Sequence, residues 1–404
     1  MSRIILSCTA TMVILLSSCV PPTQTPDVQQ PGQTGIPTPP PVIEEPPLSA
    51  NPPSMSFIHG CYVHGRRIGD INQLRQSRLD QFNILYLIAG PDWKPTDFDL
   101  SSSEAIQKLV NNHTYPAGQS GIAMAPELLR RAHKSGVKTL LSIQDGEFLP
   151  LAQNPHRRAC FAKVMTAFVK KYGYDGIEID WESDFDIPLH AALMADIRQT
   201  LHELSRSTSR YYYLATALMA GKKYSADLAG RLSRSVDWIN IMTYDIGGGT
   251  WGTTPSHNTP LNRIKQLMND WSVFPPGKVC IGLANYGYYY QGIQPGQKSS
   301  IPLRSIGRSI YHNQMAALLA AGWTETFDNQ ALAPYYFSPD RRDFVSIDNT
   351  VSLDHKMWWI SQRGYRGVFW WEFHCDLVPA APGQRYAEHP LIDHVEAKIR
   401  GYSR

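Results

Sequence analysis

Eight short, apolar, β-rich runs separated by amphipathic helical stretches constrain the fold of this chain more than any other feature. Strands that alternate with helices indicate repeated βα units around a parallel sheet. Eight such units predict an α/β fold, the (β/α)8 TIM barrel. The runs are Phe57–Val63, Phe82–Ala89, Val137–Ile143, Gly176–Trp181, Tyr211–Ala217, Val236–Thr243, Lys278–Ala284 and Arg366–Trp371, and the helical stretches include Pro155–Lys171, Pro188–Ser207, Thr259–Trp271 and Tyr386–Arg400.

Two connections are longer than a barrel needs: residues 90–120, which follow the second run, and the segment before the eighth run. About 70 residues, Tyr288–Met357, separate the seventh run from the eighth. A structureless loop of that length is uncommon in a compact domain. The helix-like run Ile310–Ala321 and the strand-like runs Pro334–Phe337 and Phe344–Ile347 predict a small α+β insertion at about 288–352, between strands seven and eight.

The first residues have the pattern of an export signal. Arg3 precedes the apolar run Ile4–Leu16, which is shorter than the roughly 20 residues of a membrane-spanning helix but long enough for a signal-peptide core. Leu16–Cys19 resembles the lipobox of bacterial lipoproteins, in which cleavage precedes a cysteine that becomes lipidated. We expect residues 1–18 to be a lipoprotein signal peptide and Cys19 to anchor an exported protein to a membrane, at the outer membrane or cell surface. The alternative is an ordinary secreted protein in which Cys19 has no role.

A proline-rich segment follows. Twelve of the 30 prolines fall within Val20–Pro53, which contains no Lys, Arg or aromatic residue. Such a segment cannot bury enough apolar surface to fold, and its prolines favour an extended, semi-rigid spacer. We expect residues 19–53 to be a linker and residues 54–404 to be a catalytic domain that acts as a monomer.

Composition excludes several classes of function. A formal net charge of +3 with 18% charged residues is too balanced for a nucleic-acid-binding protein. The cysteines of the body form no CxxC or Cys/His metal spacing, so we expect buried free thiols, no metal ion and no cofactor. These cysteines are Cys61, Cys160, Cys280 and Cys375.

The most informative segment is Tyr174–Glu182, with the sequence YDGIEIDWE. Alternate residues of a strand point to opposite faces, so Glu178, Asp180 and Glu182 share one face and the apolar side chains share the other. In a barrel the apolar face packs against the outer helices, which directs the three carboxyl groups inward and toward the C-terminal mouth. Buried like charges are costly, so these groups must share protons or meet strong donors. The arrangement fits glycoside cleavage, with Glu182 at the strand end as the candidate acid.

The same run resembles the DGxDxDxE signature of glycoside hydrolase family 18, the chitinase family, over Asp175–Glu182. Two other strands agree with this resemblance. Met242–Asp245 matches the family's MxYD motif, and Gly367–Glu372 resembles its GVMFWE pattern. The likeness covers essentially residues 57 to 400.

The resemblance implies substrate-assisted, retaining hydrolysis of β-1,4-linked N-acetylglucosamine polymers, with chitin or its oligosaccharides as substrate. Glu182 would protonate the glycosidic oxygen while the substrate's own 2-acetamido oxygen attacks the anomeric carbon and gives an oxazolinium ion. Asp180 would accept the acetamido N–H, the Tyr244 hydroxyl would hold the acetamido oxygen, and Glu178 would share a proton with Asp180. The residues expected to bind sugar are Trp371 as an apolar floor, Asp245, Met242, Tyr286, Trp251 and Tyr62.

Three positions depart from the family pattern. The first acid is Glu178 rather than Asp, and the SxGG motif of strand three appears as Ser142–Asp145, whose serine would normally hydrogen-bond that acid. Tyr288 stands where many relatives have an arginine that contacts the sugar. These departures bear on rate and pH profile more than on reaction type.

Alternatives remain open at this point. Another N-acetylglucosamine glycan, such as peptidoglycan or an N-glycan core, would undergo the same acetamido chemistry. A non-catalytic, lectin-like chitin-binding protein could use the same barrel, although such members typically lose the acid at the position of Glu182. Trp251 and Tyr286 either stack on successive sugars or pack beneath the insertion.

Overall fold

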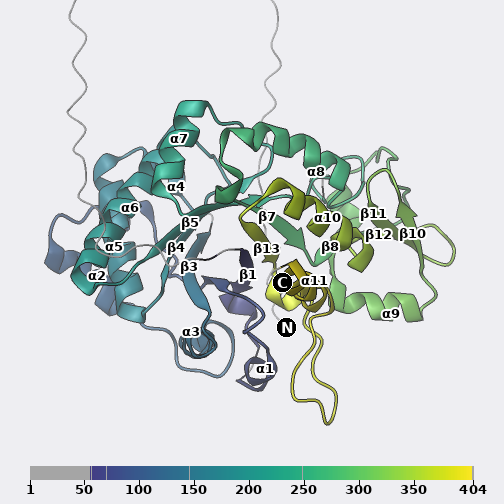
Figure 1. Cartoon of the computed structure of the whole chain (residues 1–404), viewed down its shortest axis with the longest axis horizontal. Helices are drawn as coiled ribbons and strands as arrows, with labels where there is room; N and C mark the ends of the chain where they lie inside the picture. Colours follow the sequence, from purple (N-terminus) through teal and green to yellow (C-terminus); the bar gives the residue numbers. More distant parts are fainter. Residues whose placement is uncertain (1–54, 56, 70, 145, 248, 403–404) are drawn as a thin grey trace, which may run out of the picture. The chain divides into compact units, whose positions relative to one another are not determined.

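Parallel strands close into a barrel in the computed structural model of this chain (Figure 1). The structure describes residues 55, 57–69, 71–144, 146–247 and 249–402, so the predicted signal peptide, the lipidation site Cys19 and the linker lie outside the described residues. All neighbouring barrel strands pair in parallel. Around the barrel the strands are β1 (Ile58–His64), β13 (Gly367–Trp371), β7 (Val279–Ala284), β6 (Trp238–Met242), β5 (Tyr213–Met219), β4 (Gly176–Asp180), β3 (Lys138–Gln144) and β2 (Ile84–Ile88).

The eight predicted strand runs are therefore confirmed, with ends that shift by one or two residues. Their residues are nearly all buried, as expected for parallel strands that pack on both faces. The side chains that point outward join one apolar cluster with the surrounding helices, and those that point inward join a second cluster that fills the barrel. The predicted TIM barrel is confirmed.

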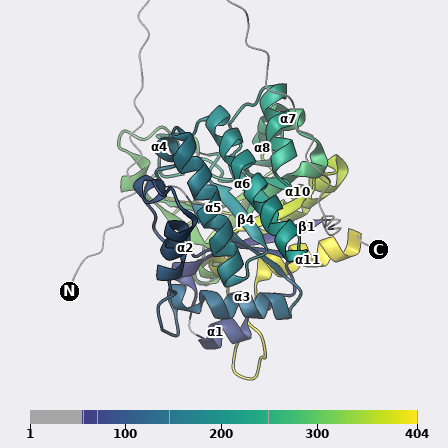
Figure 2. The ribbon, with the colours of Figure 1, turned by 90° about the vertical axis from the view of Figure 1, so that its left-hand side faces the viewer.

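Helices cover the outside of the barrel, and Figure 2 shows α5 and α6 in front of β4. Local sequence explains their ends: α5 starts after Asn154, whose side chain accepts from the backbone N–H groups of residues 156 and 157, and ends at Gly173 with φ 80°. The predicted helix over Thr259–Trp271 is divided into α8 and a 3₁₀ turn. The helices are α1 (Ile71–Gln76), α2 (Ser103–Asn112), α3 (Ala125–Lys134), α4 (Phe148–Ala152), α5 (Pro155–Tyr172), α6 (Ile187–Thr208), α7 (Ala226–Ser235), α8 (Leu261–Met268), α10 (Thr350–Arg363) and α11 (Pro390–Tyr402).

The insertion between the last two barrel strands is a five-stranded antiparallel sheet with one helix, which we call the lobe. Its strand order is β10-β11-β12-β8-β9. The predicted α+β character is confirmed, but the sheet begins at Tyr286, two residues earlier than predicted, and the predicted helix over Ile310–Ala321 is wrong in its first residues. Ile310 ends up in a strand because it pairs with Gly287. The elements are β8 (Tyr286–Tyr290), β9 (Gly307–Tyr311), α9 (Met315–Ala320), β10 (Thr324–Asp328), β11 (Ala333–Phe337) and β12 (Phe344–Ser346).

The lobe and the barrel interior share one apolar cluster. Tyr288, Tyr290 and Phe344 of the lobe belong to the same buried cluster as Tyr86 and Phe369 of the barrel. The lobe is therefore packed onto the mouth of the barrel and forms a fixed wall beside it. The four cysteines are buried and free, as predicted.

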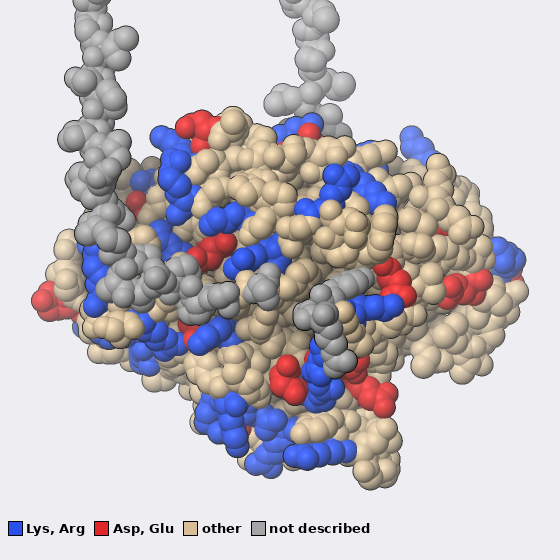
Figure 3. Space-filling model, viewed as in Figure 1, with Lys and Arg blue, Asp and Glu red and all other residues tan. Residues whose placement is uncertain are grey.

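Figure 3 shows one face of the molecule, on which basic and acidic side chains are interspersed among uncharged ones. In the described part of the chain, no helix has both the length and the apolar character needed to cross a bilayer.

Candidate active site

Strand β4 places two of the three predicted carboxylates inside the barrel and the third at its mouth. Glu178 and Asp180 are buried, whereas Glu182 lies two residues beyond the last strand residue and is exposed. The apolar partners Ile177 and Ile179 face the outer helices and are completely buried. The predicted inward orientation of this face is therefore confirmed.

Gly176 lets β4 approach β5 closely. A Cβ atom at this position would lie 2.1 Å from the backbone oxygen of Tyr213, which no other residue could accommodate without moving the strand. The glycine of the YDGIEIDWE run therefore has a packing role that sets the position of the carboxylates that follow it.

Glu178 sits in a network of neutral donors. Its Oε2 atom accepts from the Ser142 hydroxyl at 2.6 Å, and its Oε1 atom accepts from the Tyr62 hydroxyl at 3.0 Å. Asn240 in turn donates to the Tyr62 oxygen at 3.1 Å. Burial raises the pKa of Glu178 to about 7, although the Ser142 and Tyr62 hydrogen bonds act in the opposite direction. The remnant of the SxGG motif thus makes the contact expected of its serine, and Glu178 holds a proton up to near-neutral pH.

Asp180 receives a hydrogen bond that the sequence interpretation missed. Gln144 at the end of β3 donates from Nε2 to Asp180 Oδ2 at 3.2 Å. The two residues are direct neighbours in the parallel register of β3 and β4. A glycine of the SxGG motif would leave Asp180 without this donor. The signal that could have revealed the contact is the register, because Gln144 lies as far along β3 as Asp180 lies along β4.

Tyr244 and Asp245 follow β6 at the mouth. Burial raises the pKa of Tyr244 well above its ordinary value, and the neighbouring Asp180 and Glu182 charges add to this effect, so its hydroxyl remains a hydrogen-bond donor. Asp245 Oδ1 accepts from the hydroxyls of Tyr286 at 2.7 Å and Tyr288 at 2.6 Å. Burial raises the pKa of Asp245 despite these two hydrogen bonds.

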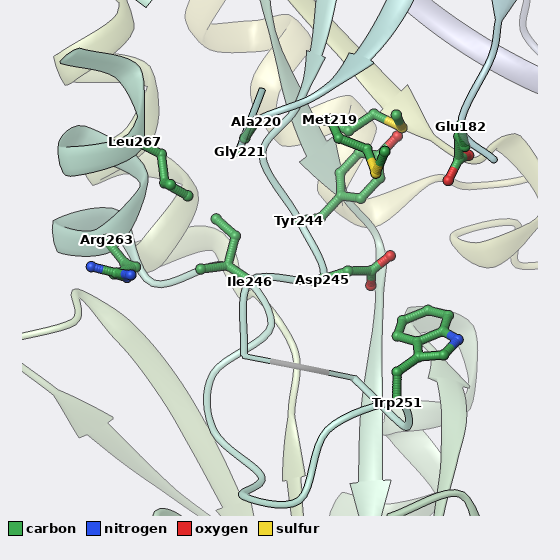
Figure 4. Close-up of a pocket in the computed structure, with 11 residues that line it drawn as sticks. Glu182, Met219, Ala220, Gly221, Tyr244, Asp245, Ile246, Trp251, Arg263 and Leu267 are labelled. Atoms are coloured by element: carbon green, nitrogen blue, oxygen red, sulfur yellow. The ribbon is translucent and has the colours of Figure 1, made fainter. Parts of the chain in front are cut away.

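A cavity of about 430 Å³ opens beside these residues (Figure 4). It brings together five of the predicted site residues, and Trp251 stands at its rim with 68% of its surface exposed. Arg263 from α8 also lines it, although the sequence interpretation did not single out this residue. The lining residues are Glu182, Met219, Ala220, Gly221, Met242, Tyr244, Asp245, Ile246, Trp251, Arg263 and Leu267.

The remaining predicted site residues lie outside this lining. Tyr286 is 93% buried behind Asp245, which makes it a support for that carboxyl rather than an exposed stacking platform. Trp371 is half-buried at the end of β13, and its ring centroid lies 5.4 Å from that of Tyr62. Tyr62 is a partner of Glu178 in the barrel interior.

No metal centre accompanies the carboxylates in the described residues. Within this part of the chain, no three His, Cys, Asp or Glu side chains converge in a way that could hold a metal ion. The carboxyl and hydroxyl groups at the mouth of the barrel can supply acid–base catalysis and hydrogen bonding.

One known family matches most of this chain. The model of the family described as Glycosyl hydrolases family 18 matches residues 55–376. The chain is 25% identical over 299 residues to Chitinase A1 of Niallia circulans, which covers 63% of this chain and 43% of that protein. It is 26% identical over 333 residues to Endochitinase 1 of Metarhizium robertsii, and 76% of each chain is covered. The chain thus spans less than half the length of the first relative and about three quarters of the second.

Solved structures show the same fold. A GH18 chitinase from Cycas revoluta, solved in complex with (GlcNAc)3, aligns with a TM-score of 0.65 at 17% identity over 86% of this chain and 99% of its own. The chitinase TsES1 from Trichuris suis aligns with a TM-score of 0.66 at 20% identity over 85% of this chain and 100% of its own.

Proposed function

Because this chain belongs to glycosyl hydrolases family 18, we propose that it hydrolyses β-1,4-linked N-acetylglucosamine polymers, with chitin and its oligosaccharides as substrates. One observation supports this proposal above the others. Glu182 is exposed in a cavity that it shares with Tyr244 and Asp245, while Glu178 and Asp180 lie buried on the same strand. An acid in contact with the cavity can reach a bound glycosidic oxygen, and a lectin-like protein would not need it.

In the first step, the Glu182 carboxyl gives its proton to the glycosidic oxygen, and the bond from that oxygen to the anomeric carbon breaks. The substrate's own acetamido oxygen forms a new bond to the anomeric carbon, which yields an oxazolinium ion. Asp180 accepts the acetamido N–H and balances the positive charge, and the protonated Tyr244 hydroxyl donates to the acetamido oxygen.

In the second step, the Glu182 carboxylate takes a proton from water, whose oxygen attacks the anomeric carbon and opens the oxazolinium ring. Two displacements at one carbon retain its configuration. Glu178 contributes by remaining protonated near neutral pH, because the buried pair on β4 then carries one negative charge rather than two.

The variant Glu182→Gln tests this proposal. We expect its kcat on chitotetraose to fall by about a thousandfold or more because the general acid is lost, while the sugar still binds. Glu203→Gln, which changes an exposed acid on α6, is the matched control and should keep the activity of the unmodified protein. Undiminished hydrolysis by Glu182→Gln would contradict the proposal. Parallel digestion of chitin, peptidoglycan and an N-glycan core tests which of these glycans is the substrate.

We also propose that the protein is exported and anchored through lipid on Cys19, which the lipobox-like segment Leu16–Cys19 supports. Cys19→Ala should move the protein from the membrane fraction of the producing cell to the soluble fraction. Cys8→Ala, an exchange inside the expected signal peptide, is the control. Membrane association that survives Cys19→Ala would contradict the anchor.

A further inference from the structure

The cavity beside Glu182 extends away from the carboxylates to helix α8. In Figure 4, Arg263 and Leu267 face the cavity from α8, and Tyr244 and Asp245 lie between this helix and Glu182. The two α8 residues are one helical turn apart, so they occupy one face of the helix. The cavity therefore has an acidic end at Glu182 and a basic end at Arg263.

The Arg263 guanidinium is available to a ligand. Its Nη1 atom donates to the neutral side chain of Gln266 at 2.8 Å, and the structure records no carboxylate within ion-pairing distance of Arg263 among the described residues. The side chain is also exposed, although its helix contributes Leu261 and Ile264 to the buried core. The backbone that carries Arg263 is thus fixed while most of its donors remain open.

The basic end lies on the side of the leaving group. The sugar that is attacked must place its acetamido group at Asp180 and Tyr244, above Trp371, which does not line the cavity. Glu182 protonates the glycosidic oxygen, which joins the anomeric carbon of this sugar to the sugar that leaves. The part of the cavity that runs from Glu182 to α8 therefore receives the sugars that depart.

The charges of the lining favour an uncharged sugar. Two carboxylates, Glu182 and Asp245, face a single guanidinium, so the cavity has no positive excess that would select an acidic glycan. A guanidinium is planar and carries five N–H donors, which suits the acetamido carbonyl and hydroxyl oxygens of N-acetylglucosamine. Tyr288, at the position where many relatives have an arginine, lies on β8, and its hydroxyl donates to Asp245.

We propose that Arg263 determines specificity by binding an uncharged N-acetylglucosamine unit on the leaving side of the cleaved bond. This inference rests on the proposed hydrolase activity. The contact that we assign to Arg263 involves a sugar on the leaving side of the bond that breaks. Its effect therefore depends on how many sugar units the substrate has on that side.

Two substrates separate this contact from the chemistry. Chitotetraose can place N-acetylglucosamine units on the leaving side, whereas 4-nitrophenyl N,N′-diacetylchitobioside has a nitrophenol leaving group. We expect Arg263→Gln to lower the ratio of kcat/KM for the tetrasaccharide to that for the aryl glycoside about tenfold. Lys265→Gln removes the same charge from the same helix but lies against a different cavity, so it should leave this ratio unchanged.

The outcomes distinguish this inference from the proposed activity. If the unmodified protein cleaves both substrates and Arg263→Gln leaves the ratio unchanged, the inference is wrong and the activity stands. If neither substrate is cleaved, the proposed activity is wrong, and a binding measurement tests the role of Arg263 instead. Calorimetry with chitotetraose should then show about tenfold weaker binding to Glu182→Gln/Arg263→Gln than to Glu182→Gln alone, and equal affinities would overturn it.

Discussion

The two ends of strand β4 hold buried carboxyl groups in opposite ways. At the N-terminal end, Asp175 is surrounded by basic side chains: Arg210 lies 2.5 Å, His133 2.7 Å and Lys138 3.5 Å from its oxygens. Burial alone would raise the pKa of Asp175, but the His133 hydrogen bond, the Thr139 amide and the Lys138 charge together lower it. Further toward the C-terminal end, Glu178 accepts hydrogen bonds from the hydroxyls of Ser142 and Tyr62, and burial raises its pKa.

Asp175 and Glu178 belong to the same YDGIEIDWE run, but one stabilises the fold and the other belongs to the candidate active site. The lowered pKa of Asp175 favours its charged form, and the residue joins β4 to α3, β3 and the segment before β5, which is a structural task at the closed end of the barrel. Glu178 is kept close to its titration point, which is useful only where protons move. Substitutions at the two ends should therefore affect different properties.

The largest stability effect is expected at the charged end. Asp175→Ala removes the shared partner of three basic side chains, and we expect it to lower the free energy of unfolding by about 3 kcal/mol, a value that allows for the partial exposure of those side chains. Denaturant titration measures this loss. Asp196→Ala, which breaks a more exposed pair with Arg158, should have a clearly smaller effect. If both variants lose the same stability, the structural role of Asp175 is wrong.

A pH-dependent effect is expected at the neutral end. Between pH 4.5 and about 7, the folded protein keeps a proton on Glu178 that the unfolded chain has released, so this group makes the fold less stable as pH rises through that window. Glu178→Gln mimics the protonated acid and removes this dependence. We compare the free energy of unfolding of the variant with that of the unmodified protein at each pH. This difference should favour the variant more at pH 8 than at pH 5, by on the order of 2 kcal/mol.

Thermal unfolding at the two pH values gives the comparison directly. Asp175→Asn is the control, because the lowered pKa of Asp175 produces a dependence of the opposite sign that lies at lower pH. A stability difference between Glu178→Gln and the unmodified protein that stays constant from pH 5 to pH 8 would refute the titration assigned to Glu178.

The smallest effect is expected at Gln144, which positions Asp180 without touching substrate. Gln144→Met keeps the length of the side chain and removes the donor, and we expect kcat to fall about fivefold with little change in KM because one hydrogen bond is lost. Steady-state kinetics on chitotetraose provide the measurement. A rise in KM at unchanged kcat would instead show that Gln144 binds substrate.

Sequence patterns predicted the barrel because each of its strands carries an apolar run. The same criterion failed in the lobe, where Thr324–Asp328 forms strand β10 with mostly exposed, polar residues. Strand β8 (Tyr286–Tyr290) was not predicted either, since its five consecutive glycine and tyrosine residues show no alternation of polar and apolar positions.

The carboxylates of the site could be predicted because they lie on one strand and their order follows from its alternation. The motif also indicated Ser142 as a partner of Glu178. The contacts of Gln144 and Tyr62 with these acids could not be predicted, because both residues come from other strands. Gln144 and Tyr62 are 36 and 116 residues distant from the acids they contact, and only the register of the closed barrel brings them there. Arg263 escaped notice for a related reason: a single arginine on an amphipathic helix looks like any solvated charge until the cavity beside it is known.

Strand β10 has a consequence for how copies of this protein meet. An antiparallel sheet that ends in a free strand offers unpaired backbone groups to a neighbouring chain, and extended apolar edges of this kind promote aggregation. The exposed Thr324, Glu325 and Thr326 give this edge a charged and hydroxylated border instead. Such a border discourages sheet-to-sheet association, which matters most for molecules that are tethered to a surface at high density.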